Sequence, residues 1–297
     1  MRRWIKTAWV VAGLFAAMPL YAGKVYLMGG GYADRNTDLF VNGLRKATGL
    51  DPSFVPNIAS TANCGTNWAT TACPRIAVVT SASASYAIGL DAFSNDLGSG
   101  SNVKRGYYNL FQTHGFSPKF ITAHVDNFAT HAYSGNTAGN ANIAILNQAD
   151  VVFFAGGDQA KIARTWLTDS GADTPLGAAL RTRWNANSAS FVVGGDSAGN
   201  HAMNALMHGV GISYGYLYYN ANLPTQAVTQ WQSFGDTRDG LDALRYFDNG
   251  AKLKGLSLLP PSVLTDTHFD SRSGRLGRLL AAMRSMGIAQ GLGVDED

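Results

Sequence analysis

The sequence predicts an α/β fold, a three-layer sandwich with a mostly parallel central sheet. Short apolar runs rich in β-branched and aromatic residues alternate with segments of helical periodicity. Strands that are apolar on both faces are typical of parallel sheets covered by helices on both sides. The predicted strands are Val25–Met28, Ile76–Thr80, Phe120–His124, Val151–Ala155, Phe191–Val193 and Leu256–Leu259. The predicted helices are Asn102–His114, Ile143–Ala149, Lys161–Leu167, Leu176–Trp184 and Ala202–His208.

The N-terminus predicts export. Three basic residues within the first six positions precede an apolar run over 8–20, and a Leu-Tyr-Ala sequence ending at Ala22 offers a cleavage site. This order is typical of a secretory signal peptide, and the run is short for a bilayer span. An uncleaved membrane anchor is the alternative. We expect residues 1–22 to be removed, leaving a secreted or periplasmic protein without a membrane span and one hydrolytic domain over 23–297.

The charge balance argues against a nucleic-acid partner. Residues 1–22 carry three positive charges and no acidic one, so the formal net charge of +3 falls to zero in the mature chain. Binding to nucleic acid usually needs a basic surface that persists in the mature protein. A hydrophobic content of 46% with only 14% charged residues also argues against disorder.

The two cysteines predict a disulfide. Cys64 and Cys73 lie nine positions apart in a polar stretch, and an exported protein meets an oxidising environment. Neither has His or Cys partners at ligand spacing, so no metal site is expected around them. No organic cofactor is expected either, and a homodimer is left open.

The sharpest motif is Gly195-Asp-Ser-Ala-Gly199, which joins a predicted strand directly to a predicted helix. Gly-x-Ser-x-Gly in that context is the nucleophile elbow, a strained turn that exposes the serine hydroxyl above the sheet. The amide of Ala198, at the helix start, can donate to a developing oxyanion. The alternative is that Ser197 only caps the helix.

A nucleophilic serine needs a base, and His268 has the best position among the six histidines. It follows the serine in the chain and comes directly after a predicted strand end, with Asp266 two residues before it. The other five are interpreted as structural, surface or packing residues: His114, His124, His131, His201 and His208.

Glycines follow or end three of the predicted strands, at 29–31, 156–157 and 194–195. Parallel sheets bind ligands at the carboxyl ends of their strands, and glycine lets backbone amides approach a ligand. We therefore expect these three segments to form the floor of a cleft. The polar and aromatic region 209–254 is interpreted as a long insertion near that cleft.

Four blocks in this chain resemble the serine peptidase family of the cyanophycinases and aspartyl dipeptidases. Phe154-Ala-Gly-Gly-Asp-Gln159 resembles its Gly-Gly-Asn/Asp-Gln loop, and residues 195–199 resemble its elbow. Asp266-Thr-His-Phe269 with the arginines that follow resembles its histidine segment. Gly291-Leu-Gly-Val-Asp-Glu296 resembles the segment that supplies its third catalytic member. The blocks occur in the family's order and cover most of residues 150–297.

The resemblance implies a role for each matching residue. Ser197 would be the nucleophile, His268 the general base and Glu296 the carboxylate that orients it. The amides of Ala198 and Gly157 would form the oxyanion hole. The implied substrate-binding residues are Gln159, Asp266, Arg272, Arg275 and Arg278. At least one of these arginines, Arg272 or Arg275, would hold a substrate carboxylate; the alternative is a solvated helix face.

The function implied is an exported serine-type exopeptidase that hydrolyses cyanophycin, an aspartate and arginine polymer, to β-Asp-Arg dipeptides. Departures from the family pattern concern specificity: Asp196 replaces Thr, Asn200 replaces Ala and Thr267 replaces Gln. One alternative is an α-aspartyl dipeptidase of the same family. Another is a non-catalytic protein that binds an acidic ligand. A trypsin-like peptidase is excluded because its fold is all-β and its histidine precedes its serine.

Overall fold

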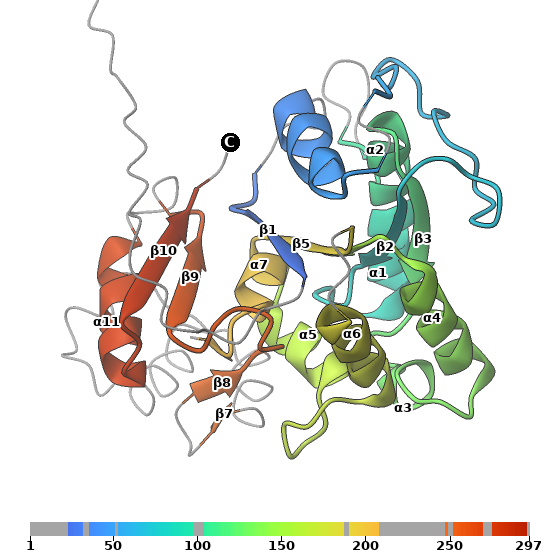
Figure 1. Cartoon of the computed structure of the whole chain (residues 1–297). Helices are drawn as coiled ribbons and strands as arrows, with labels where there is room; N and C mark the ends of the chain where they lie inside the picture. The colour runs from blue at the N-terminus through green and yellow to red at the C-terminus, as the bar shows by residue number, and fades with distance from the viewer. Residues whose placement is uncertain are drawn as a thin grey trace, which may run out of the picture.

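The structure, a computed structural model, describes residues 23–31, 36–50, 53–97, 104–186, 190–207, 247–248, 252–269 and 275–295 (Figure 1). Within these residues, no helix is both long and apolar enough to cross a membrane. Cys64 and Cys73 are joined by a disulfide, with their Cα atoms 5.9 Å apart. The predicted signal peptide at 1–22 lies outside the described residues, as does the predicted insertion at 209–254 apart from 247–248 and 252–254.

A five-stranded parallel sheet forms the centre of the molecule, which confirms the predicted α/β class. Its order is β1-β5-β4-β2-β3, and every neighbouring pair is parallel. This order places β1 and β3 at the edges of the sheet and β5, β4 and β2 in its interior. The strands are β1 (Lys24–Met28), β2 (Arg75–Val79), β3 (Ser117–Ile121), β4 (Val151–Phe154) and β5 (Val192–Asp196).

Alternate residues of the inner strands face two separate cores, as a period of two requires. In β4, Val152 and Phe154 join one core, whereas Val151 and Phe153 join the other. The first core packs against α4 (Thr137–Gln148), α5 (Gln159–Trp166), α6 (Pro175–Asn185) and α7 (Ala198–Ala202). The second packs against the π-helix η1 (Asp38–Arg45), α1 (Tyr86–Ser94) and α2 (Tyr107–Thr113). These are the two helical layers predicted around the sheet (Figure 1).

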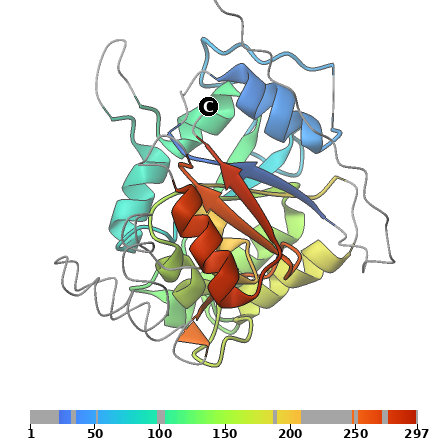
Figure 2. The same ribbon diagram turned by 90° about the vertical axis from the view of Figure 1, so that its left-hand side faces the viewer.

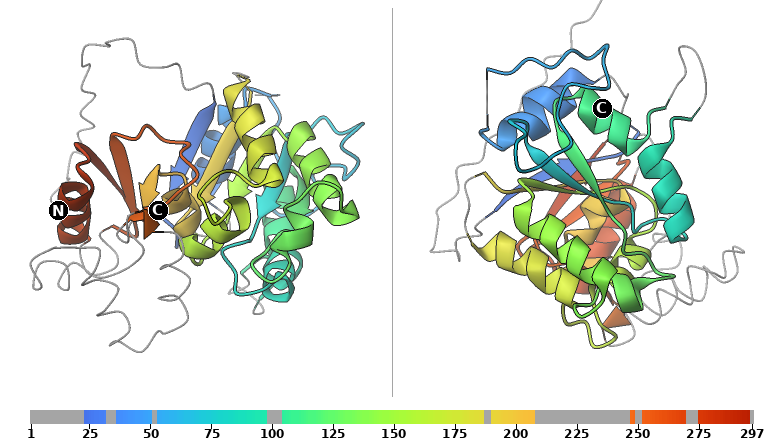
Figure 3. Two further views of the ribbon diagram at one scale, coloured as in Figure 1. Left: turned by 90° about the horizontal axis from the view of Figure 1, so that it is seen from below. Right: turned by 90° about the vertical axis from the view of Figure 1, so that its right-hand side faces the viewer.

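A second, smaller unit lies beside the β1 edge of the central sheet (Figures 1 and 2). Its strands β9 (Val263–Thr267) and β10 (Gln290–Val294) pair in parallel, and α11 (Leu276–Met286) covers them. Leu264, Leu279, Ala282 and Ile288 form its own small apolar cluster. Seen from below, this unit and the central sheet form distinct layers (Figure 3, left).

Several predicted boundaries are wrong for identifiable reasons. Strand β3 begins at Ser117, three residues early, because Pro118 is tolerated in an edge strand. The helix predicted from Asn102 begins at Tyr107. The predicted strand Leu256–Leu259 is an irregular segment whose amides bond the end of α7: Leu256 N–H donates to Ala202 O, and Leu258 N–H to Met203 O. Its leucines are buried there, which explains the apolar run.

A helix is predicted at Ala202–His208, but in the structure α7 ends at Ala202 and a short strand follows it. Strand β6 (Leu206–Met207) pairs with β8 (Lys252–Lys254), and β8 pairs with β7 (Phe247–Asp248), all antiparallel. His208 lies outside the described residues. The turn brings Asn204 under the segment that leads into β9, because Ser257 N–H donates to Asn204 O at 3.1 Å.

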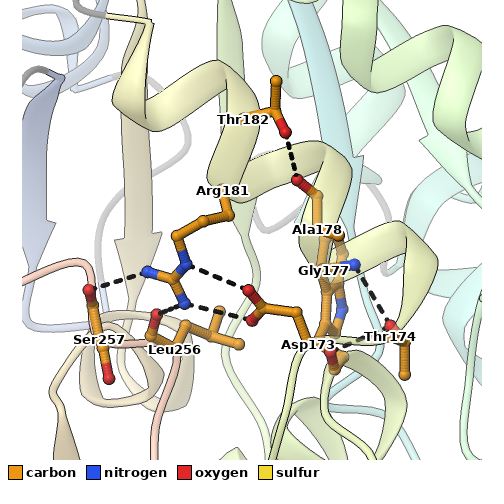
Figure 4. Close-up of polar contacts among 9 residues, drawn as sticks. Asp173, Thr174, Gly177, Ala178, Arg181, Thr182, Leu256 and Ser257 are labelled. Atoms are coloured by element: carbon orange, nitrogen blue, oxygen red, sulfur yellow. Dashed lines mark hydrogen bonds and ion pairs between the residues drawn. The ribbon is translucent and has the colours of Figure 1, made fainter.

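An arginine on α6 holds the segment before β9 from the other side (Figure 4). Arg181 makes a two-pronged ion pair with Asp173, both bonds 3.2 Å long, and donates to the carbonyl oxygens of Leu256 and Ser257. Ser257 has a φ of 51°, in the left-handed region that non-glycine residues seldom adopt. Arg181 therefore fixes a strained turn in the chain that delivers β9.

Candidate active site

Ser197 occupies the turn between β5 and α7, as the elbow motif predicts. Its φ of 48° and ψ of −116° lie far from the favoured regions for a non-glycine residue. Its N–H donates to Met28 O at the end of β1, at 3.2 Å, and its carbonyl accepts from His201 N–H at 3.0 Å. Strain of this kind persists only where the surroundings impose it, and it concentrates at functional sites. Ser197 makes no side-chain capping bond to α7, so the capping alternative does not describe it.

The glycines on either side of Ser197 are required by close packing. A Cβ on Gly195 would lie 2.6 Å from the carbonyl carbon of Gly199, and a Cβ on Gly199 would overlap Phe154 O. Gly194 packs against Leu44 and Phe153 in the second core. The prediction that 194–195 forms part of a cleft floor is therefore wrong: these glycines bring α7 and the core against β5.

His268 reaches Ser197 from the small unit. It follows the last residue of β9, and its N–H donates to Gly29 O at 3.2 Å. Its Nε2 lies 2.7 Å from Ser197 Oγ, and only 5% of the residue is exposed. With its proton on Nδ1, a neutral imidazole accepts the serine proton at Nε2, which is the geometry of a nucleophile and its base.

The glycines after β1 and β4 make room for this pair. Gly30 has a φ of 102°, and a Cβ there would overlap the Cε1 atom of His268. A Cβ on Gly156 would lie 3.2 Å from Ser197 Cβ. Two of the three predicted glycine segments therefore border the serine and histidine directly. The chain after β10 also reaches this edge, because a Cβ on Gly29 would overlap the backbone of Asp295.

A buried network of amides and one hydroxyl joins α7 to β9. Asn200 Nδ2 donates to Met28 O at 3.0 Å, and Thr265 Oγ1 donates to Asn200 Oδ1 at 2.8 Å. Asn204 completes the network, accepting from Thr265 N–H and donating to Thr265 Oγ1, both at 2.9 Å. All three side chains are fully buried. The network thus ties the strand that carries His268 to the helix that follows Ser197.

Sequence reasoning singled out Ser197 and His268, which the structure brings into contact, but missed this network and the contact of Gly30. Asn200 was recognisable only as a departure from the family's Ala. Thr265 carried no signal, because a threonine in a β-branched run predicts only a strand. Gly30 belongs to a predicted segment, yet its contact with a histidine 238 positions later depends on tertiary structure.

Other predicted site residues lie around β9. Asp266 is fully buried, and its Oδ1 accepts from Thr267 N–H at 2.8 Å. Arg275 immediately precedes α11; it donates to Thr267 O at 2.6 Å and lies 3.8 Å from Asp266 Oδ1. These contacts brace the turn that carries His268. Arg272, Glu296 and the side chain of Arg278 lie outside the described residues.

The loop after β4 brings its predicted residues to the same edge. Gly157 is exposed, with a φ of 141°, and a Cβ there would lie 2.7 Å from Ala82 O. Gln159 is half-buried and begins α5. The cap of that helix is its neighbour Asp158, which accepts from Ala160 N–H at 2.8 Å and pairs with Lys161 at 2.6 Å. Gln159 is therefore not required as a capping residue.

The remaining described histidines have packing roles. His124 is fully buried; its Nδ1 lies 3.1 Å from Thr122 O and its Nε2 lies 2.9 Å from Thr80 Oγ1. Burial lowers the pKa of His124, so it is neutral at pH 7, donates from Nδ1 and accepts at Nε2. His114 packs on Phe40, with ring centroids 4.7 Å apart. In the described part of the chain, no three His, Cys, Asp or Glu side chains are grouped as metal ligands.

Comparison with solved structures finds a structural likeness. No family model matches the chain. The chain is similar to the crystal structure of a peptidase from an acI-B1 Actinobacterium, with 15% sequence identity and a TM-score of 0.47. The similarity covers 93% of this chain and 81% of that one. The geometry described above defines the class of site: an α/β fold with a strained serine at a strand-to-helix turn, in contact with a histidine.

Proposed function

We propose that this protein is a serine peptidase in which Ser197 is the nucleophile and His268 the general base. The observation that carries the proposal is the 2.7 Å contact between Ser197 Oγ and His268 Nε2, made by a serine whose backbone is strained at a strand-to-helix turn. A serine that merely capped a helix would need neither the strain nor the histidine.

The chemistry follows from these two atoms. His268 Nε2 takes the hydroxyl proton as Ser197 Oγ attacks the peptide carbonyl carbon. The tetrahedral intermediate collapses when the C–N bond breaks and Nε2 gives the proton to the leaving amine. Water then attacks the acyl ester, giving its proton to Nε2, and the ester bond breaks as that proton returns to Ser197 Oγ. No external oxidant or reductant is needed.

Two further roles complete the proposed machinery. The amides of Ala198 and Gly157 stabilise the oxyanion, supported by the position of Ala198 at the start of α7 and of Gly156 against Ser197. Glu296 orients His268. One support is the four-block resemblance. Another is that Asp295, the residue before Glu296, packs against Gly29, whose carbonyl accepts from His268 N–H.

The proposed substrate is an aspartyl peptide, with cyanophycin as its most specific form and β-Asp-Arg as the product. The support is the order of the four sequence blocks, which matches the cyanophycinases. Cleavage of ordinary α-aspartyl dipeptides is the competing specificity, favoured by Thr267 and Asp196 in place of the usual residues. Both use the same nucleophile, so the difference lies in the pocket rather than in the chemistry.

We also propose that the protein is exported. The basic and apolar pattern of residues 1–22 supports this location. A second, independent support is the disulfide between Cys64 and Cys73, because such bonds persist mainly in oxidising compartments.

The test is to incubate the protein with insoluble cyanophycin and, separately, with α-aspartyl dipeptides, alongside Ser197→Ala. Release of β-Asp-Arg by the wild type alone is the expected result, with a loss of at least about 10⁴-fold in the variant. Hydrolysis of the dipeptides alone would assign the dipeptidase specificity. If a folded wild type hydrolyses neither, the peptidase proposal fails and a binding protein for acidic ligands takes its place.

A further inference from the structure

A pocket of about 200 Å³ lies at the carboxyl ends of β2 and β4, the edge of the sheet that presents Ser197. Thr80 follows β2 and Gly156 follows β4, and both line it. The outer wall comes from the connection between α1 and α2, including Leu97, Lys104 and Arg105. Ligands of parallel sheets bind at such strand ends.

The pocket wall comes close to the nucleophile at Gly156. Gly156 contributes to the pocket wall, and a Cβ on it would be 3.2 Å from Ser197 Cβ. Because Gly156 has no side chain, a substrate whose carbonyl carbon sits at Ser197 Oγ can extend a neighbouring group into the pocket. The pocket is thus placed as a subsite of the proposed peptidase.

Two consecutive basic residues, Lys104 and Arg105, line the pocket. None of the described residues that line it is acidic. Two carboxylates lie close to the pocket. Asp196 is buried on the Ser197 side, with Oδ2 3.4 Å from where a Cβ on Gly156 would be, and Asp96 Oδ1 accepts from Gly106 N–H in the outer wall. On the outer wall the two basic residues outnumber the single carboxylate of Asp96, which favours an anion there.

The segment that presents the two cations is held in place by several contacts. Lys104 and Leu97 exchange backbone hydrogen bonds of 2.8 and 2.7 Å. Gly106 N–H donates to Asp96 Oδ1 at 2.8 Å, and a Cβ on Gly106 would lie 2.8 Å from Asn95 O. Arg105 Nη1 donates to Thr113 Oγ1 on α2. A preorganised wall binds a ligand with less loss of conformational freedom.

We propose that this pocket binds a carboxylate of the substrate through Lys104 and Arg105. The inference rests on the proposed function, since a subsite has meaning only if Ser197 attacks the substrate. It also gives the acidic specificity a source other than Arg275, whose guanidinium braces Thr267 and Asp266. Arg and Lys are the side chains that pair with carboxylates, Arg by a fork of N–H donors and Lys as a point charge.

The test uses covalent labelling of Ser197 by an uncharged fluorophosphonate, with small molecules as protecting ligands. Succinate carries the proposed carboxylate, and succinamide is its uncharged counterpart. We expect succinate to slow labelling at concentrations where succinamide does not. In Lys104→Met, roughly tenfold more succinate should be needed for the same protection, the loss expected for one charge-assisted hydrogen bond. Lys104→Arg should retain most of the protection.

The matched control is Lys24→Met, because Lys24 lies at the amino end of β1, at the opposite edge of the sheet. Protection is compared with each variant's own unprotected labelling rate. Equal protection by succinate and succinamide, or equal losses in Lys104→Met and Lys24→Met, would overturn the subsite. Absence of labelling in the wild type would instead refute the proposed function. Calorimetric titration of the wild type with succinate would then test, independently of labelling, whether the pocket binds a carboxylate.

Discussion

Ser197 and His268 lie on two parts of the molecule that are built differently. Ser197 directly follows β5, an inner strand of the central sheet with a large core on each face. His268 directly follows β9, a strand of a two-stranded sheet that has one small apolar cluster. Main-chain packing therefore fixes the serine, whereas a few polar contacts and one glycine fix the histidine. From this difference we expect His268 to be the more easily displaced member of the pair.

The largest effect is expected where the small unit meets the central sheet, at Gly30. Gly30→Ala introduces a Cβ that overlaps the His268 ring at a φ of 102°. Displacing a catalytic group by about 1 Å can cost on the order of 100-fold in rate, so we expect a loss in kcat of that size. Steady-state kinetics on an aspartyl peptide measures it.

Gly135→Ala is the matched control for that change. Gly135 has a φ of 91°, but a Cβ there meets nothing within 4 Å. Both variants should lose about 1–3 kcal/mol of stability from backbone strain, yet only Gly30→Ala should lose activity. Equal activities in the two variants would show that Gly30 does not position the histidine.

The buried network gives the next largest effect. Asn200→Ala removes the acceptor of Thr265 Oγ1 and the donor to Met28 O. We expect about 1–3 kcal/mol of lost stability and roughly a tenfold lower kcat, with KM little changed, because β9 shifts relative to α7. Urea unfolding and kinetics on the same preparations give both quantities.

Asn142→Ala separates a positioning role from a purely structural one. Asn142 is also a buried asparagine, bonded to Thr122 and His131 between α4 and β3. Its loss should cost similar stability and leave kcat within about twofold, as expected for a change that is not coupled to the site. A tenfold fall in kcat in both variants would mean that activity follows stability alone.

A smaller effect is expected at Arg181, which braces the approach to β9. Arg181→Leu removes the bonds to Asp173, Leu256 and Ser257 (Figure 4). Its counterpart is Arg75, which makes the same two-pronged pair with Asp150 at the amino ends of β2 and β4. Each loss should cost about 1 kcal/mol. Only Arg181→Leu should lower kcat, by a few-fold, and a similar fall in Arg75→Leu would remove the distinction between the two regions.

The smallest effect concerns pH and belongs to the central sheet alone. The pKa of buried His124 is lowered in the folded state, so the unfolded chain takes up a proton first as the pH falls. The free energy of unfolding should therefore decrease below about pH 6.5 and level off at the lowered pKa. In His124→Gln this slope should be shallower. An unchanged slope in urea titrations between pH 7 and 5 would show that His124 does not contribute.

Sequence patterns predicted the central sheet well and the small unit poorly, for a physical reason. Strands β2, β4 and β5 are apolar on both faces because helices cover both faces, so their runs are continuous. By contrast, β10 is Gln-Gly-Leu-Gly-Val and is mostly exposed, which leaves no periodic signal. The positions of Ser197 and His268 after strand ends were predictable, because strand ends and motif order are local signals. Contacts such as Asn200 with Thr265 were not, because they depend on how two separate units meet.

The central claim, that His268 activates Ser197, is tested most directly by covalent labelling with a fluorophosphonate followed by peptide mapping. Ser257 provides an internal control, because it shares the positive φ, 51° against 48°, while its main chain bonds to Asn204 and Arg181. We predict one adduct, on Ser197, that is lost in His268→Gln while Ser257 stays unmodified. Labelling of Ser197 at an unchanged rate in His268→Gln, or an adduct on Ser257 instead, would contradict the assignment.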